Sequence, residues 1–442
     1  MISFAPYAHQ PSRLEDFLPW ALLVGPGIVL NKDGSFQKTA RFRGPDVRSS
    51  TPDELVSFVA RANNVFRRLG SGWAIYIEAE RTEVTDYPAG VFDDDLSRLV
   101  DSERAAAFEQ ASSQFETIHH LTLQWTPAPD SSRKASAFFF ELDQAKQSSP
   151  KPTAKARKAG GAIDRQVALD ALEQFATSCN HAFGLFAAIV AEFHPLTDDE
   201  TLSYLKRAVS NRRTDIRAPA AAAFIDGLIC DAPLIGGVAP MLGDRHLRLL
   251  TIKGFPPFTN PGMLDDLNAL GMPYRWMTRH LCLDRAEAER ELTKWRRLWF
   301  SKHKSLSALV KEMLTKEQAA FSNPDAIAKT EEVDAALAEV GSELVGFGFF
   351  TSTLVVMGST PHEADERLRH AERVISSRGF ASVTETLNAV EAWLSSLPGH
   401  AWANVRHPMV STLNLAHIAP LATPWAGDPW NRHFDAPPLA VT

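Results

Sequence analysis

The first third of the chain alternates apolar and polar residues with a period of two, which is typical of half-buried β-strands. Residues 22–30 and 35–43 are two such runs. The sequence Asn-Lys-Asp-Gly between them is a turn signal, because glycine tolerates positive φ. The pair therefore predicts a β-hairpin. Two further strand-like runs cover 72–81 and 116–126.

Other segments place apolar residues at helical spacing. Thr51 and Glu54 form a capping-box pattern ahead of an amphipathic helix over 55–69. Thr197 is followed by acidic residues, which favours an N-cap and a helix that begins there. The remaining helical patterns lie near 93–114 and over 164–191.

The central region has a regular order of elements. Strand-like runs cover 246–253, 274–283, 346–357 and 379–386. Helical patterns follow the first and third of these runs, at 261–270 and 361–378. The order βαββαβ is that of ferredoxin-like units. Between the two middle strands, the apolar stripes of two long helices predict an antiparallel helical hairpin over 284–345.

These patterns predict an α+β fold. An N-terminal β-hairpin and mixed α-β unit precedes a ferredoxin-like βαββαβ unit that carries the inserted helical hairpin. The expected organisation is an N-terminal α+β domain (1–145), a basic flexible loop (146–163), a helical segment (164–240), a ferredoxin-like domain with its insertion (241–393) and a Pro-rich linker (394–442). Arg406 is the only formally charged residue of 394–427, which makes that stretch distinctive.

Composition narrows the classes of partner. The formal net charge of -7 gives no global attraction to phosphate backbones or anionic lipids. Three widely spaced cysteines, Cys179, Cys230 and Cys282, form no C-x-x-C pair, so we expect reduced and buried thiols. No secretory signal pattern opens the sequence, and no apolar stretch reaches the roughly 20 residues of a membrane span. We therefore expect a cytoplasmic protein.

Sequence signatures of common catalytic sites are missing. None of the 24 glycines is followed by lysine, so the chain has no G-x-x-x-x-G-K-[ST] loop to wrap a triphosphate. The G-x-G-x-x-G, G-x-S-x-G and H-E-x-x-H motifs are also missing. We assign no catalytic, cofactor-binding or metal-binding residue.

Residues 203–217 hold five basic side chains against one acidic side chain. Arg212 and Arg213 could contact nucleic acid, which gives an alternative function as a nucleic-acid-binding module. No aromatic residues are interleaved with these cations, and the chain is acidic overall. A solvated face or a protein contact is therefore favoured.

Several smaller clusters have structural interpretations. His119 and His120 are neighbours in a predicted strand and point to opposite faces, which makes them poor co-ligands of a metal. Cys179, His181 and His194 are better explained by a packed thiol and surface imidazoles. The acidic run 93–95 is interpreted as a helix cap and dipole partner.

Tryptophan is enriched in interface hot spots, and two tryptophans lie one helical turn apart on the predicted hairpin. Trp295 and Trp299 either pack within the hairpin or anchor another subunit. Trp402, Trp425 and Trp430 lie in or near the low-charge stretch and are candidate interaction residues.

The sequence resembles a known family over nearly its whole length, in collinear order. The likeness is carried by GPGIVLNKDGSFQKTARFRGPD (25–46), LGDRHLRLLTIKGFPPFTNPGMLDDLNALGMPYRWMTRHLCLD (242–284), KWRRLWFSKHKS (294–305) and ETLNAVEAWLSSLPGHAWANVRHPMVSTLNLAHIAPLATPWAG (385–427). These stretches resemble the TrbE/CagE family of conjugative type IV secretion ATPases.

The resemblance implies a non-catalytic first half that precedes a RecA-like motor domain. ATP and magnesium would bind in that motor domain, and this segment alone would be inactive. The segment would be a scaffold that forms a homo-oligomer, with a hexamer as one arrangement, and docks to inner-membrane secretion subunits and to its own ATPase domain. It would lie in the cytoplasm, peripheral to the bacterial inner membrane, without binding nucleic acid directly. Residues 394–442 would lead toward the motor domain. If they pack on it, Trp402, Trp425 and Trp430 would be unusually exposed in this segment.

Overall fold

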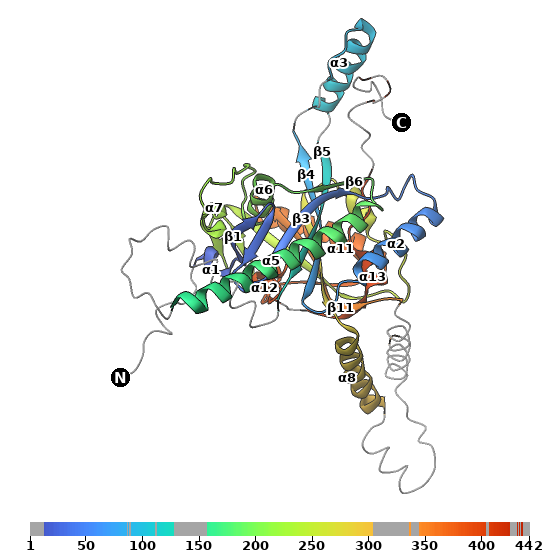
Figure 1. Cartoon of the computed structure of the whole chain (residues 1–442). Helices are drawn as coiled ribbons and strands as arrows, with labels where there is room; N and C mark the ends of the chain where they lie inside the picture. Colours follow the sequence, from blue (N-terminus) through green and yellow to red (C-terminus); the bar gives the residue numbers. More distant parts are fainter. Residues whose placement is uncertain are drawn as a thin grey trace, which may run out of the picture.

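A single antiparallel sheet organises the part of the chain that the structure, a computed structural model, describes (Figure 1). That part comprises residues 13–85, 87, 90–110, 113–127, 157–303, 336, 344–403, 406–424, 431, 433 and 435, with the backbone alone for 157–165 and 295–303.

The strands and helices are numbered in chain order. The strands are β1 (Trp20–Gly25), β2 (Ile28–Asn31), β3 (Phe36–Arg43), β4 (Trp73–Val84), β5 (Gln114–Trp125), β6 (Glu192–Pro195), β7 (Leu234–Ile235), β8 (Met241–Leu242), β9 (Arg245–Gly254), β10 (Tyr274–Leu283), β11 (Phe347–Gly358), β12 (Ala381–Thr384) and β13 (Met409–Ser411). The helices are α1 (Leu14–Phe17), α2 (Pro52–Phe66), α3 (Asp95–Gln110), α5 (Arg157–Ala187), α6 (Asp198–Val209), α7 (Ile225–Ile229), the 3₁₀ helix η2 (Asp265–Ala269), α8 (Arg285–His303), α11 (Pro361–Ser377), α12 (Ala389–Ser395) and α13 (Thr412–Ile418).

The sheet joins segments that are distant in the sequence. Its main strand order is β1-β2-β3-β5-β4-β10-β11-β9-β8-β7, with β6, β12 and β13 paired beside it. The junction between the N-terminal and central regions is the antiparallel pair β4–β10, which runs from Ala74–Leu281 to Arg81–Tyr274. The predicted α+β class is confirmed, and strands from both regions share one sheet.

The central strands have the order of the predicted βαββαβ unit. Strand β12 pairs with β9, β9 with β11, and β11 with β10, all antiparallel. The first predicted helix, over 261–270, is in fact the short 3₁₀ helix η2. Gly262 precedes it with φ of +67°, and the segment is too irregular for a longer α-helix.

Local signals were reliable, with two corrections. The hairpin across Asn31 and Gly34 forms, but the run 22–30 is divided into β1 and β2, because Gly27 turns the chain at a φ of +64°. Helix α5 begins at Arg157, inside the segment expected to be a loop. Most of the second half of the predicted helical hairpin lies outside the described residues.

Helices cover both faces of the sheet. On one face, α2, α5, α11 and α13 bury a large apolar cluster that includes Phe66, Phe175 and Leu415. On the other face, α1, α6, α7 and α12 bury a second cluster around Trp20 and Trp393. The alternation of side chains along each strand supplies apolar residues to both layers.

The low-charge stretch near the C-terminus is part of this core. Strand β13 pairs with β11, and α13 lies against α2. The side chains of Leu397, Leu415 and Ile418 are buried. This differs from the linker expected over 394–442: most described residues up to Thr423 pack within the fold, and burial here explains their lack of charge.

In the described ranges, no helix has both the length and the apolar character needed to span a bilayer.

Replacing Leu415 with alanine tests this integration. The side chain is fully buried between α13 and the rest of the apolar cluster, so we expect the free energy of unfolding to fall by about 2–5 kcal/mol. Urea unfolding measures the change. Leu387→Ala is the matched control, because that leucine is 85% exposed. Equal effects of the two substitutions would show that α13 is not part of the core.

Candidate interaction surfaces

The centre of one sheet face is polar although it is buried. On β4, Tyr76, Glu78 and Glu80 point to the side of the sheet opposite Ile75 and Ile77. On the neighbouring β10, Arg275 lies opposite Glu80, and Arg279 lies opposite Tyr76. Carboxylates and guanidinium groups therefore meet in the interior of the molecule, where each needs a partner.

Glu78 and Arg275 form the central ion pair of this face. The side chains are 2% and 8% exposed, and the Arg275 Nε–H donates to a Glu78 carboxylate oxygen. The Tyr204 hydroxyl of α6 donates to the other oxygen at 2.6 Å. Burial raises the pKa of Glu78, while the Arg275 charge and these hydrogen bonds oppose the rise.

Glu80 pairs with two of the five cations that suggested a nucleic-acid surface over 203–217. Its carboxylate accepts from Arg207 at 3.2 Å and from Arg213 at 3.1 Å. Lys206 pairs with Asp231 at 3.2 Å. Arg212 is exposed, and its backbone N–H is bonded to the Ser210 hydroxyl at 3.0 Å. The structure therefore places three of the five cations against carboxylates of the same chain.

The loop after α12 closes the polar face. Arg275 also donates to the hydroxyl and carbonyl oxygens of Ser396. The fully buried Arg279 donates to the carbonyl oxygens of His400 at 2.7 Å and Ala403 at 3.0 Å. Arg275 and Arg279 of β10 therefore hold the two ends of the 396–403 loop by hydrogen bonds.

Gly399 lets this loop approach the sheet. Its φ is +86°, and a Cβ there would lie 1.9 Å from the Gln37 Oε1 atom. Only glycine fits this contact without displacing Gln37. The Trp20 indole N–H donates to the Pro398 carbonyl at 2.7 Å, which holds the turn from the other side.

The closed loop displays Trp402. Its side chain is 74% exposed, and its indole N–H donates to Asp33 at 3.0 Å. This is the exposure that the family resemblance implies for Trp402. Trp425 and Trp430 lie outside the described residues, as do the side chains of Trp295 and Trp299, which the backbone of α8 carries.

The histidines and cysteines singled out in the sequence are dispersed. His119 packs against Phe42 and is within 3.1 Å of the Thr423 hydroxyl, whereas His120 lies on the opposite face against Tyr204. Burial lowers the pKa of His119 to about 3, so it is a neutral core residue. Cys179 is buried. Among the described side chains, no three histidine, cysteine, aspartate or glutamate residues are grouped as metal ligands.

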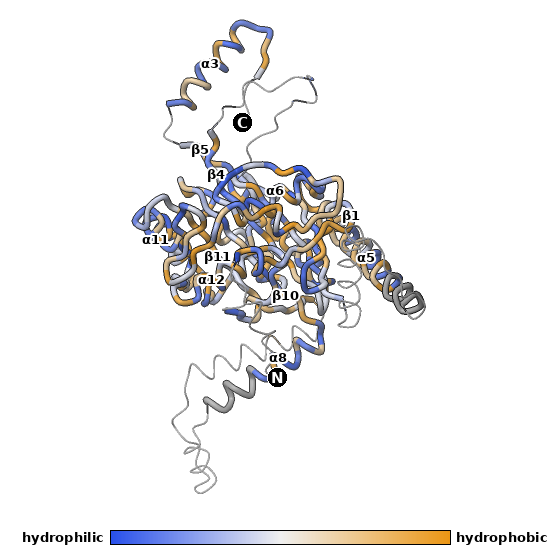
Figure 2. The backbone as a smooth tube through the Cα atoms, turned by 90° about the vertical axis from the view of Figure 1, so that its left-hand side faces the viewer, coloured by the Kyte–Doolittle hydropathy of each residue, from blue (hydrophilic) through white to orange (hydrophobic). Residues whose placement is uncertain are grey.

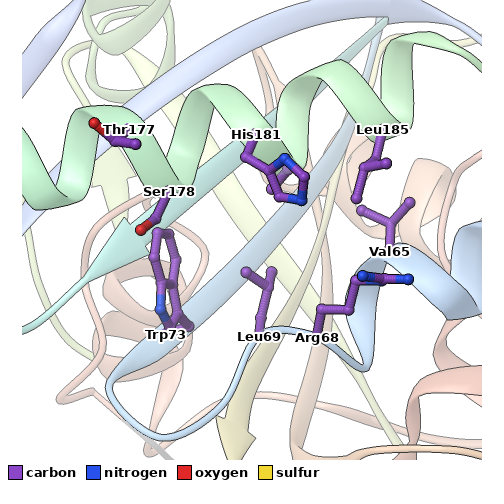
Figure 3. A pocket seen from close by; sticks show the side chains of 9 residues that line it. Val65, Arg68, Leu69, Trp73, Thr177, Ser178, His181 and Leu185 are labelled. Carbon is purple, nitrogen blue, oxygen red and sulfur yellow. The ribbon is translucent and has the colours of Figure 1, made fainter.

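A groove of about 360 Å³ lies between α2 and α5, and we call it the α2–α5 groove. Val65, Leu69 and Ala182 form a buried apolar floor, and Trp73 lies at one end. Figure 3 shows the facing sides of the groove, with Val65, Arg68, Leu69 and Trp73 on one and Thr177, Ser178, His181 and Leu185 of α5 on the other. The groove therefore offers an apolar floor with a polar and basic rim.

A second exposed feature, which we call the α3 arm, consists of α3 and the strand ends that carry it. Residues Thr82–Val84 of β4 pair with Gln114–Glu116 of β5 beyond the last β10 pair. No residue of α3 is buried, and Leu96 and Leu99 are 67% and 55% exposed. Figures 1 and 2 show the helix projecting from the body, with hydrophobic stretches along it.

Sequence patterns missed the features that organise these surfaces. Glu78, Arg275 and Arg279 lie in segments correctly expected to be strands, but no residue pattern showed that the two strands are neighbours. A signal was present, because oppositely charged residues recurred inside apolar strands, where an unpaired charge is costly. The sequence predicts the helix that carries Leu96 and Leu99 and its acidic cap, but not that these two leucines are exposed.

Lowering the pH should loosen the 396–403 loop. Burial and the nearby Arg279 depress the pKa of His400 to about 4, despite Asp33, whereas an unfolded histidine titrates near 6.5. The unfolded chain therefore binds the extra proton first. The stability that neutral His400 contributes is present above about pH 6.5 and is lost as the pH falls toward 4.

In urea unfolding across this range, we expect His400→Gln to flatten the pH dependence by about 1.4 kcal/mol per pH unit. Identical pH profiles for the two proteins would contradict the burial of a neutral imidazole at this position.

Comparisons with known proteins place this architecture in a family. The family model "Type IV secretion system ATPase VirB4/TrbE, N-terminal domain" matches residues 27–133. A second model, "CagE, TrbE, VirB family, component of type IV transporter system", matches residues 300–406. These two ranges include strands on both sides of the β4–β10 junction.

Individual relatives belong to the same family as the two matching models. Conjugal transfer protein TrbE of Rhizobium radiobacter is 31% identical over 443 residues, which cover 97% of this chain and 51% of that protein. The first of two pieces of a probable conjugal transfer protein TrbE in Sinorhizobium fredii is 39% identical over 131 residues, which cover 29% of this chain and 88% of that piece. Type IV secretion system protein virB4 of Bartonella quintana is 20% identical over 416 residues, covering 93% of this chain and 49% of that protein.

The chain thus spans about half the length of the longer relatives it matches. The resemblance seen in the sequence is confirmed by the two family models and by the shorter relative, which the chain covers almost completely. The chain therefore belongs to the VirB4/TrbE family of type IV secretion and conjugal transfer ATPases.

Proposed function

We propose that this chain is the scaffold and docking region of a conjugative type IV secretion ATPase of the TrbE type. The observation that carries the proposal is the combination of family membership with a 442-residue sequence in which no glycine is followed by lysine. A P-loop motor cannot grip a triphosphate without that lysine. ATP and magnesium are then bound by a RecA-like domain that this sequence does not include.

The scaffold role has two aspects, self-association and attachment to the secretion machine. The chain forms a homo-oligomer and docks on inner-membrane secretion subunits as a peripheral protein. Its exposed features support both aspects: the α3 arm, the α2–α5 groove and Trp402 are separate surfaces of one fold. Trp402 is 74% exposed and held by Asp33, which suits a contact with its own ATPase domain or with another subunit.

The alternative function as a nucleic-acid-binding module has less support. Arg207 and Arg213 are paired with Glu80, and Lys206 with Asp231, so few cations of 203–217 remain to neutralise phosphates. Counterion release, which supplies most non-specific affinity, needs several such cations together.

Two assays on the purified chain test the proposal. Titration with Mg-ATP should show no saturable binding and no turnover above background. Vesicle flotation should show the chain rising with inner-membrane vesicles from cells that carry the secretion machine, and remaining below with vesicles from cells that lack it.

The controls separate lipid from protein contacts. A full-length family member with its P-loop serves as the positive control for ATP turnover. Turnover by the 442-residue chain itself would contradict a purely scaffolding role. Equal flotation with both kinds of vesicle would replace docking on secretion subunits with direct binding to lipid.

A further inference from the structure

Helix α3 carries an exposed stripe on the side that faces away from its own supporting segment. Tyr87 contacts α3 through a hydrogen bond from its hydroxyl to Asp101 at 2.9 Å and through ring contact with Phe108. At 100° per residue, Asp101 and Phe108 share one side of the helix. Leu96, Leu99 and Glu103 share the opposite side, at steps of three and four residues.

The stripe combines apolar and acidic character. Leu96 and Leu99 are 67% and 55% exposed, and Glu103 is exposed beside them. Residues 93–110 contain six acidic side chains and two arginines, so the whole arm is negatively charged. An exposed apolar pair inside a charged rim is typical of a protein interaction site.

The α2–α5 groove has the complementary character. Its floor is apolar, and Arg68 stands at its rim as an exposed cation. The Arg68 Nε–H donates to the Asn64 carbonyl at 3.1 Å, which orients the guanidinium group at the end of α2. A second hollow of about 430 Å³ adjoins the groove through Arg68 and Leu69. Arg67 and Asp284 line it, together with Arg285, which is paired with Glu289 at 2.9 Å. Apolar floor and basic rim match the apolar stripe and acidic rim of the α3 arm.

The arm cannot reach the groove of its own chain. Strand β4 begins at Trp73, in the groove, and ends at Val84, at the base of the arm, so these points are about 36 Å apart. Helix α3 adds about 24 Å of length and projects away from the body (Figures 1 and 2). A contact between arm and groove therefore requires two molecules.

We propose that the α3 arm of one copy docks in the α2–α5 groove of the next copy. Leu96 and Leu99 lie on the apolar floor near Leu69 and Trp73, and Glu103 pairs with Arg68. Because two different surfaces meet, the contact is heterologous, and repetition produces a closed ring or an open filament according to the rotation between copies. The inference rests on the self-association in the proposed function and names its surfaces.

A cross-linking experiment tests the geometry. Two versions of the 442-residue chain carry Leu99→Cys or Ser178→Cys, each with Cys230→Ser to remove the partly exposed native thiol. A short bismaleimide should join copies in the mixture of the two versions and leave each version alone uncoupled. Cross-linking of Leu99→Cys to itself would mean a symmetric arm-to-arm contact and would overturn the proposal.

A charge exchange tests the pairing. Arg68→Glu and Glu103→Arg should each raise the dissociation constant for self-association by about tenfold or more, measured by analytical ultracentrifugation. The protein with both changes should return toward the original affinity, because the pair is restored with reversed signs. Glu109→Arg is the matched control, since this residue lies on another side of α3 and should leave affinity within a few-fold.

The outcomes separate this inference from the proposed function. Self-association that is unaffected by either charge reversal, or that yields no mixed cross-link, overturns the arm-in-groove contact and leaves oligomerisation in place. A chain that stays monomeric at all concentrations overturns both the contact and the self-association. Docking on inner-membrane vesicles is measured by flotation, and its result does not depend on the outcome of the self-association experiments.

Discussion

The pairing of β4 with β10, closed by the buried ion pair of Glu78 and Arg275, is the constraint on which the rest of the structure depends. A charge taken out of water costs several kcal/mol unless its partner is positioned well. Here Arg275 satisfies Glu78 and the two oxygens of Ser396 at once, and Tyr204 completes the carboxylate. One arginine therefore ties together the N-terminal strands, the central strands and the C-terminal loop.

This arrangement gives the sheet two different faces. The face under α2, α5, α11 and α13 is a conventional apolar core, whose energy comes from burial of large side chains. The other face is polar at its centre and depends on fixed hydrogen bonds to α6 and to the 396–403 loop. Since a half-satisfied buried network is worse than an apolar one, the loop has one favourable position, and Trp402 is displayed there.

Local chemistry determined what could be predicted from the sequence. The turn at Asn31 to Gly34, the capping box at Thr51 and the N-cap at Thr197 involve neighbours within four residues, and all three form as expected. The central strand order also followed from the succession of elements. Contacts between distant segments could not be predicted. Glu78 and Arg275 are separated by 197 positions, and no pattern in either strand indicates which strand it pairs with.

The interaction surfaces divide in the same way. The exposure of Trp402 was expected from the family resemblance. The low charge of the surrounding stretch has another cause, because most of its described residues are buried in the fold. The pairing of Arg213 with Glu80 could not be predicted from the sequence, because the two residues lie 133 positions apart. The acidic residues 93–95 were correctly interpreted as a cap, since Asp94 accepts from the Ser97 N–H at 2.9 Å. The exposed Leu96 and Leu99 beside that cap indicate an interaction surface only because the structure shows that α3 projects from the body.

Hydrogen exchange in rising urea tests most directly whether the β4–β10 junction makes one cooperative unit of the two regions. If it does, slowly exchanging amides of β5 and of β11, which lie on either side of that junction, open together with one free energy and one urea dependence. Separate openings, with the β5 amides exchanging through a lower free energy than the β11 amides or the reverse, would contradict this central claim.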